Sequence, residues 1–355
     1  MAYTKTLENF IPEIWSKQLL RNWDDEFIMR KLVNTRYEGE ITSFGDTVHV
    51  PYLGNISVAD YDNSNENPIS YQDVDDLTST LAIDQRKYWA FKVEDVEKAQ
   101  SKVEVREEYT KRAAVAMKDE VEEWLLGSDF CDAIGQIVDA TGTAGAQARA
   151  NSTAYSLGDF VQPSTANGYV YKCTTAGTSA GSAPTFPTIL GATVTDGTVV
   201  WTNWGYIGHG KVTNTNLYKT LVSAKKAFRK ANTWIEGDMW AVIPPEIEEL
   251  ILTSSELTHA TERGDQLLEQ GLMGKLAGFK LYCSNNVSGA GSSASPFRIL
   301  CGNRETITFA EQITETEAVR LENEFATGVS GLMVYGGTIF DRNKYAGVEI
   351  FAELG

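Results

Sequence analysis

A long helical repeat pattern between about Val93 and Leu126 constrains the fold of this chain more than any other feature. Small, mostly apolar side chains recur along it at spacings that place them on one side of a helix: Val96, Ala99, Val103, Thr110, Ala113, Met117, Val121 and Trp124. Such a helix of about 30 residues is roughly 45 Å long. The apolar stripe is too thin for a coiled coil. We therefore predict a single helix that lies across a sheet and ends near Gly127.

A strongly acidic segment precedes this helix. The 355 residues carry a net charge of −17, and ten carboxylates lie between Tyr37 and Gln85, where there is no Lys or Arg. Alternation at 47–50 and 77–83 predicts two strands, joined by turn residues, so we expect a long hairpin arm. Its charge discourages indiscriminate edge pairing. The acidic balance also argues against a protein that mainly grips nucleic acid, because phosphate binding needs a basic surface.

The composition changes abruptly at Thr141. From there to His209 the chain has thirteen threonines but only four charged residues: Arg149, Asp159, Lys172 and Asp196. Short strand patterns occur at 160–161, 169–171 and 198–201, and residues 196–197 form an Asp-Gly turn dipeptide. An uncharged, strand-rich stretch between two charged helices predicts an inserted β domain, which we place at 151–207.

Beyond this segment, residues 216–231 predict a second helix. Its apolar face comprises Leu217, Leu221, Ala224 and Phe228. Six basic residues and no acid occur in and just before it: Lys211, Lys219, Lys225, Lys226, Arg229 and Lys230. Residues 240–243 and 348–351 predict strands, and Pro245 suits the first turn of a short helix. Helices and strands do not alternate regularly, so the predicted fold class is α+β.

Familiar catalytic and metal-binding patterns are missing from the sequence. His49, His209 and His259 stand alone, without a second ligand at metal spacing. Glycines at 271–275 and 289–291 lack the spacing of a phosphate or dinucleotide loop, and there is no nucleophile elbow. We therefore expect no enzyme, no cofactor and no metal site. Arms and a very long helix suit contact and assembly instead.

The cysteines and the hydropathy pattern indicate in which cellular compartment the protein folds. The four cysteines are far apart and are interpreted as free thiols of a reducing compartment: Cys131, Cys173, Cys283 and Cys301. The first residues do not follow the pattern of a signal peptide, and no segment approaches about 18 uninterrupted apolar residues. We expect neither secretion nor a membrane span.

The order of these segments resembles that of the major capsid proteins of tailed bacteriophages with the Hong Kong 97-type fold. An N-terminal amphipathic stretch at 10–15 leads to residues 45–51, the acidic hairpin, residues 89–100 and the long helix. Residues 274–286 look like the family's Gly-x-x-x-Gly-x-x-x-x-x-Ser-x-x stretch, and 309–312 and 331–336 look like its closing strands. The similarity covers everything outside the segment 151–207.

This resemblance implies a division of the chain into parts with separate roles. They are an N-terminal arm at 1–36, an extended acidic hairpin loop over a neighbouring subunit at 37–85, and a peripheral domain with a spine helix and the entry to the axial domain at 86–140. The inserted β domain at 151–207 follows, then the axial domain at 211–300 and the closing strands of the axial and peripheral domains at 301–355.

The resemblance also implies a function. The chain would be a structural subunit that self-assembles, as hexamers and pentamers, into an icosahedral shell around double-stranded DNA, without sequence specificity. Assembly would take place in the host cytoplasm, and the product would be the virion capsid, with a portal and a separate scaffolding protein as partners. Some members cross-link their shells through a loop lysine. The loop here has no lysine between Tyr37 and Gln85, and the nearest one, Lys87, lies at its base. We therefore expect no such cross-link, and boiling in denaturant should give monomers.

The opposite charges of the arm and the second helix suggest a contact between subunits. On this hypothesis, arm carboxylates meet the basic helix of a neighbour through Asp60, Asp62, Glu66, Asp73, Asp75, Asp76, Lys225, Lys226 and Arg229.

The segment 151–207 resembles small chitin-binding-type β modules in its Tyr-x-x-Gly-Asp-x-Val and Tyr-x-Tyr spacings, at 155–161 and 169–171. Exposed aromatic rings can stack on sugar faces, so a surface glycan is a candidate partner through Trp201, Trp204 and Tyr169. A module this small also needs aromatic rings for its own core.

Two other functions remain open from the sequence. A glycan-binding adhesin or tail component would use the insert as its binding part, although the chain has one such island and no repeat period. A nanocompartment shell subunit would share the fold, and the sequence separates it poorly from a phage capsid.

Overall fold

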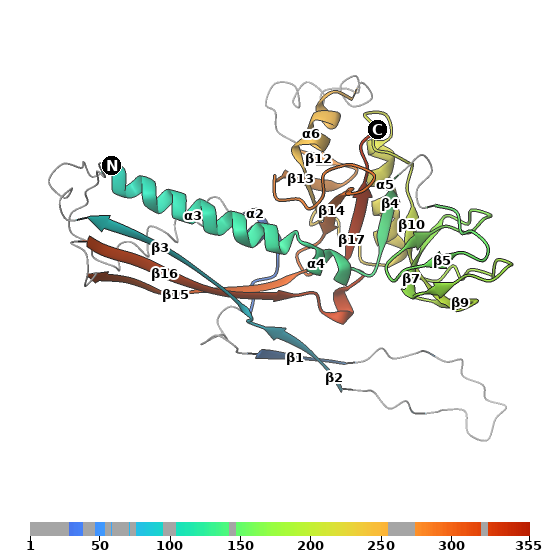
Figure 1. Ribbon diagram of the computed structural model, residues 1–355, viewed down its shortest axis with the longest axis horizontal. Coiled ribbons are helices and arrows are strands. Elements are labelled where there is room, and N and C mark those ends of the chain that lie inside the picture. The colour runs from blue at the N-terminus through green and yellow to red at the C-terminus, as the bar shows by residue number, and fades with distance from the viewer. Residues whose placement is uncertain are drawn as a thin grey trace.

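The computed structural model describes residues 28–37, 47–53, 58, 71, 76–94, 104–141, 147–254, 274–320 and 326–355. Figure 1 shows a long, thin region on one side and a thicker body on the other. Among the described helices, none is both long enough and apolar enough to cross a membrane.

The thin region is a three-stranded antiparallel sheet with one long helix, and we call its sheet the long sheet. The strand order is β15–β16–β3, with bounds β3 (Gln85–Glu94), β15 (Thr308–Arg320) and β16 (Ala326–Thr338). Helix α3 (Glu104–Leu125) runs along it (Figure 1). Lys87 of β3 forms an ion pair with Glu120 of α3, and the rings of Trp124 and Tyr335 are 5.1 Å apart. The prediction that the helix lies across a sheet is confirmed.

The predicted start of this helix at Val93 is wrong. Val93 belongs to β3, where it pairs with Thr327 of β16, and the first described helical residue is Glu104. Residues 95–103 lie outside the described part of the chain. The aromatic and β-branched residues at 88–93 have high strand propensity, and β16 supplies a partner that the local pattern cannot reveal.

The predicted hairpin strands are present. β1 (Thr47–Leu53) and β2 (Asp76–Ala82) pair antiparallel, with His49 opposite Thr80. The hairpin packs against the long sheet at Ala310 and Val334 and against Phe340, which follows β16. The hairpin residues in this cluster are Val48, Val50, Leu81 and Ile83. The hairpin is thereby joined to β16.

The body is built on one sheet of ten strands, which we call the central sheet. Its order is β12–β13–β11–β14–β17–β4–β10–β7–β6, and β9 pairs with β10 off this path. The bounds are β4 (Ile137–Ala140), β6 (Phe160–Val161), β7 (Tyr169–Thr175), β9 (Thr193–Asp196), β10 (Val199–Ile207), β11 (Trp240–Ile243), β12 (Lys275–Leu276), β13 (Phe279–Cys283), β14 (Phe297–Gly302) and β17 (Gly347–Ala352). The predicted strands at 240–243 and 348–351 are confirmed.

The helices of the body are α2 (Ile28–Leu32), α4 (Ser128–Ala133), α5 (Leu217–Lys230) and α6 (Pro245–Leu252), with a short 3-10 turn, η3 (Asp341–Asn343). Helix α5 packs on β4, β10 and β17. Its predicted apolar face is confirmed, because Leu217, Leu221, Ala224 and Phe228 are all buried. They join one continuous core that reaches Val121 and Leu125 of α3.

The segment 151–207 is rich in strands, as expected, and it continues the central sheet. Strand β10 pairs parallel with β4 through residues 205–207 and antiparallel with β7 and β9 along its length. Only the short pair β5 (Ala154–Tyr155) and β8 (Gly177–Thr178) lies outside this sheet. The segment has a small core of its own, formed by Val161, Tyr171, Cys173, Phe186, Val199 and Trp201. The sheet curls here, because Phe160 of β6 contacts Phe351 of β17 at 5.5 Å between ring centroids.

Candidate functional site

Four of the five cations of α5 lie in two rows, each placed over an aromatic ring. Lys225 and Arg229 face Trp234, with 4.6 Å and 5.7 Å to the ring centroid. Lys226 and Lys230 face Tyr206, at 5.0 Å and 5.4 Å. The spacing of four residues puts each pair on one helix face. A cation over a ring gains about 0.5–1 kcal/mol at an exposed site, so both rows stabilise the subunit itself.

The first row makes further contacts within its own chain. Arg229 forms a 2.8 Å ion pair with Glu236. Gly278 has φ +102°, and a Cβ there would lie 2.9 Å from the Trp234 ring and 3.2 Å from Lys225 Nζ. Glycine at this position therefore lets Trp234 and Lys225 pack together.

The acidic partners predicted for this helix fall mostly outside the described residues. That holds for Asp60, Asp62, Glu66, Asp73 and Asp75. Asp76 is the first residue of β2, and its backbone pairs with that of Leu53. The contact between arm and helix thus stays a prediction, while the structure places the exposed Lys226 and Arg229 and the half-buried Lys225 near the C-terminal end of α5.

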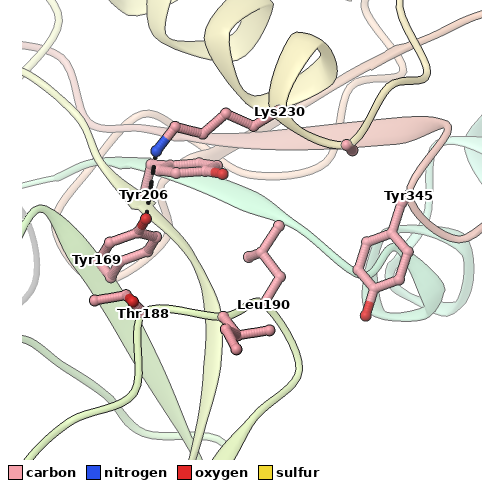
Figure 2. Close-up of a pocket in the computed structure, with 8 residues that line it drawn as sticks. Tyr169, Thr188, Leu190, Tyr206, Lys230 and Tyr345 are labelled. Atoms are coloured by element: carbon pink, nitrogen blue, oxygen red, sulfur yellow. Dashed lines mark hydrogen bonds between the residues drawn. The ribbon is translucent and has the colours of Figure 1, made fainter. Parts of the chain in front are cut away.

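The second row borders a pocket of about 400 Å³. The pocket lies between the end of α5, strands β7 and β10, and the loop after residue 187, and is lined by Tyr169, Thr188, Ile189, Leu190, Tyr206, Lys230, Ala231 and Tyr345. Figure 2 shows Tyr169 and Tyr206 on one side and Tyr345 on the other, with Leu190 between them. Lys230 Nζ donates a 3.3 Å hydrogen bond to the Tyr169 hydroxyl.

The pocket is positive, and the hydroxyl of Tyr206 beside it is neutral. Burial raises the pKa of Tyr206 to about 12, and the nearby Tyr169 adds to the rise. Lys344 lies over the Tyr345 ring at 5.3 Å, beside the opposite wall. Within the described part of the chain, no carboxylate forms an ion pair with Lys226, Lys230 or Lys344. The arrangement can therefore offer ammonium groups, phenol hydroxyls and ring faces to a ligand.

A second pocket of about 360 Å³ is balanced in charge. It is lined in part by Asp132, Phe160, Lys172, Arg298 and Phe351. Arg298 pairs with Asp132 at 2.7 Å and also with Glu349. Burial raises the pKa of Glu349, against the opposing effect of Arg298. Because Arg298 already has two carboxylate partners, this cluster is better suited to holding β14 and β17 together than to binding a ligand.

The three predicted sugar contacts have different fates. Trp201 is fully buried, and its Nε1 donates a 3.0 Å hydrogen bond to Asp196. This corrects the expectation for Trp201, because a ring inside the core offers no face to a sugar. Trp204 is half-buried with Lys172 4.5 Å above its ring. Tyr169 is half-buried and lines the first pocket. Sugar contact through Trp204 and Tyr169 stays a prediction.

Sequence reasoning did not single out the other main residues of that pocket. Tyr206 follows Trp204 by two positions on β10, Lys230 ends α5, and Tyr345 comes from the chain after η3. Alternation along β10 does not find this pocket, because a bulge between Asn203 and Gly205 separates the two rings: Trp204 packs with Phe160 and Phe351, whereas Tyr206 joins the main core beside α5. Nothing local in the sequence links either ring to Tyr345.

No catalytic arrangement stands out among the described residues, and no group of three potential metal ligands occurs there. His209 is in hydrogen-bond contact with Ser223, at 3.2 Å, and His49 lies in β1. All four cysteines are free, as predicted. Burial raises the pKa of Cys131 and Cys301, so these thiols are poor nucleophiles.

Comparisons with known proteins bear on the fold. No known family and no curated protein sequence matches this chain. Solved structures do. One from Mycobacterium phage Che8 has a TM-score of 0.60 at 18% identity, covering 99% of this chain and 95% of that one.

The capsid structure of cyanophage P-SCSP1u has a TM-score of 0.55 at 14% identity, with 100% of this chain and 90% of that chain covered. The mature capsid of bacteriophage PhiM1 has a TM-score of 0.50 at 9% identity, covering 86% and 82%. Nearly the whole chain therefore has a fold found in phage capsid structures.

Proposed function

We propose that this chain is the structural subunit of an icosahedral phage shell that encloses DNA, with the Hong Kong 97-type fold. One observation carries the proposal: the similarity to a phage structure extends over 99% of the chain, at a TM-score of 0.60. Because that similarity spans the body, the long sheet and the hairpin together, it supports a role for the whole chain. The alternatives of an adhesin or a nanocompartment have no observation of this kind in their favour.

The exposed surfaces of the long sheet support assembly. Tyr88 of β3 is 80% exposed and Val319 of β15 is 53% exposed. Closed shells form when such surfaces meet identical copies in repeated, symmetric contacts. A thin two-layer region whose second sheet face is only partly covered by the hairpin is suited to such contacts.

The proposal extends to how copies recognise each other. The acidic arm of one subunit would meet the basic end of α5 in a neighbour, through Lys225, Lys226 and Arg229. A portal and a scaffolding protein would be further partners, and packaged DNA would be held without sequence recognition. A net charge of −17 suits confinement of DNA by enclosure rather than by tight binding.

Electron microscopy of the purified full-length chain tests the main proposal. We expect closed shells of uniform diameter by negative stain, and nuclease-protected DNA in shells taken from infected cells. Monomers under all conditions, or elongated trimers, would contradict the shell. Small shells that enclose an enzyme instead of DNA would identify a nanocompartment.

A charge reversal tests the arm contact separately. Lys225→Glu with Lys226→Glu should abolish assembly, and raised salt should weaken assembly of the unmodified chain, because exposed charges are screened. Lys219→Glu is the matched control, since Lys219 is an exposed lysine of the same helix without a ring partner among the described residues. Equal assembly of both variants, together with indifference to salt, would refute the arm contact.

A further inference from the structure

We propose that the pocket between α5 and strands β7 and β10 binds an acidic sugar, such as a uronic acid unit of a polysaccharide. The inference does not depend on shell formation, because every contact it uses lies within one chain. The residues proposed for sugar binding no longer include the buried Trp201 and instead line this pocket: Tyr169, Tyr206, Lys230 and Tyr345.

The walls of the pocket are aromatic. The half-buried Tyr169 forms one wall, and the buried Tyr206 supports it from behind, with ring centroids 5.3 Å apart and an angle of 37° between the planes. Tyr345 stands on the opposite side (Figure 2). A pyranose ring has an apolar C–H face that packs on such rings, while its hydroxyls need polar partners around the edge. The hydroxyls of the three tyrosines and of Thr188 provide those partners.

The charge of the pocket selects the kind of sugar. Lys230 lines the pocket, and Lys226 and Lys344 lie over the rings of Tyr206 and Tyr345. No carboxylate is among the lining residues. Ammonium groups that have no carboxylate partner among the described residues, next to hydroxyl groups, favour a ligand that carries a carboxylate or a sulfate.

The size and exposure of the pocket favour part of a chain over a small enclosed metabolite. A volume of about 400 Å³ is near the lower end of sites for small ligands. Ile189 at its rim is 74% exposed, and Thr188 is also exposed. A polysaccharide can therefore place one or two units in the pocket and leave both ends in solvent.

A nucleic acid fits these observations less well. Tyr169 and Tyr206 already contact each other, so they leave no slot in which a flat base could be sandwiched. Duplex DNA also carries one charge per about 1.7 Å, which the net charge of −17 repels. A uronic acid polymer has a much lower charge density, so local attraction to Lys230 is opposed less strongly.

Calorimetric titration of the full-length protein tests the site. The probes are a hyaluronan tetrasaccharide, which contains glucuronate, a trigalacturonate and sialyllactose, with neutral tetra-N-acetylchitotetraose as the control. We expect saturable binding of at least one acidic probe with a dissociation constant below about 10 mM. Binding should weaken as NaCl rises from about 50 to about 500 mM, and the neutral probe should bind more weakly.

Two variants locate the site. Lys230→Gln keeps most of the chain length and should weaken binding about 10-fold or more, the loss of one charge-assisted hydrogen bond. Tyr169→Phe keeps the ring and should reduce binding less. Lys172→Gln is the matched control, because Lys172 also lies over an aromatic ring but borders the other pocket.

Three results would overturn the proposal: no binding of any acidic probe, equal affinity for the neutral probe, or loss of binding in Lys172→Gln but not in Lys230→Gln. Competition tests the alternative that a neighbour's arm fills the pocket. If a peptide of residues 58–76 binds there and none of the acidic sugars does, the pocket is an assembly contact and the sugar proposal is wrong.

Discussion

The body and the long sheet solve the problem of burial in different ways. In the body, β4 and β11 are buried at every position, and β17 is buried at all but one. In the long sheet, β3 alternates: Tyr88 and Ala90 are exposed, while Trp89 and Phe91 are half-buried. The body therefore completes its core within one chain, whereas the face of the long sheet opposite α3 is covered in part by the hairpin and leaves Tyr88 and Val319 exposed.

For the proposed shell, this difference suggests which properties belong to the single chain and which to the contacts between copies. Changes in the body should act on folding of the isolated chain, because its strands are enclosed on both faces. Changes on the open face of the long sheet should leave folding almost untouched and act on contacts between copies. Four substitutions, taken from the largest expected effect to the smallest, test this distinction.

Asp196→Ala should cause the largest loss of stability. Arg149 and Asp196 form a 2.8 Å ion pair with both side chains fully buried, and Asp196 also accepts from Trp201. Removing one partner of a buried pair costs about 3–5 kcal/mol, since the other charge stays buried. The free energy of unfolding by urea, followed by tryptophan fluorescence, measures this. Arg229→Ala breaks an exposed pair and should cost at most about 1 kcal/mol; similar losses in both would contradict the ranking.

The same pair predicts how stability depends on pH. Burial alone would raise the pKa of Asp196, but hydrogen bonds from Arg149, Trp201 and the Ala180 amide lower it below its ordinary value. A lowered pKa in the folded state stabilises the fold fully above the unfolded value, near 4, and this contribution is lost as pH falls through the folded value. Between pH 5 and pH 2, the unmodified chain should lose more stability than Asp196→Ala.

Glu122→Ala should have the second largest effect, because Glu122 joins the two regions. Its buried carboxylate on α3 accepts from the backbone amides of Ile28 and Met29, at 2.9 Å and 3.3 Å, and from Ser284 at 3.0 Å. Its loss leaves these donors unpaired, at about 3 kcal/mol in total. Hydrogen exchange should rise at 28–33 and 284–286. Glu122→Gln, which keeps an acceptor oxygen, should lose less; a loss as large as that of alanine would contradict this role.

Gly336→Ala should loosen the hairpin without unfolding the body. A Cβ on Gly336 of β16 would lie 2.1 Å from the Ala82 carbonyl oxygen of β2, so the hairpin must shift. Overpacking of this kind costs about 2 kcal/mol, and hydrogen exchange should rise in β1 and β2. Gly274→Ala is the control, since a Cβ there meets nothing within 4 Å. Unchanged exchange in the hairpin would show that β2 does not depend on this contact.

Tyr88→Ser should have the smallest effect on folding and a clear effect on assembly. The side chain is 80% exposed, so the free energy of unfolding should change by less than about 0.5 kcal/mol. Light scattering during assembly should nevertheless show a slower or absent rise. Tyr218→Ser removes a tyrosine of the body that is 42% exposed. If it impairs assembly as much as Tyr88→Ser, the contrast between the two regions fails.

Secondary structure could be predicted for segments in which the spacing of apolar residues fits either a helix or a strand but not both. The buried face of α5 follows from Leu217, Leu221, Ala224 and Phe228, which recur at helical spacing. The strands of the hairpin follow from alternation at 47–50 and 77–83. Both patterns point to one structure, so no distant partner is needed to choose between alternatives.

Other features depend on partners that are far away in the sequence. Val93 suited a helix or a strand, and its pairing with Thr327 decided for the strand. Trp201 was predicted as a candidate sugar contact. Its ring lies in the core instead, where its indole donates a hydrogen bond to Asp196, the partner of Arg149. The first pocket needs Tyr345 opposite Tyr206. Such pairings follow from the sheet order, which periodicity along one segment does not contain.

The sharing of strand β10 has a consequence for engineering and for evolution. One end of this strand pairs with β4 in the body, and the same strand pairs with β7 and β9. Excising residues 151–207 would therefore remove the neighbour of β4 and turn a fully buried strand into an open edge prone to aggregation. A foreign domain that replaces this segment must therefore supply a strand that pairs with β4. We expect exchanges to succeed only when residues 205–207 are kept or an equivalent strand takes their place.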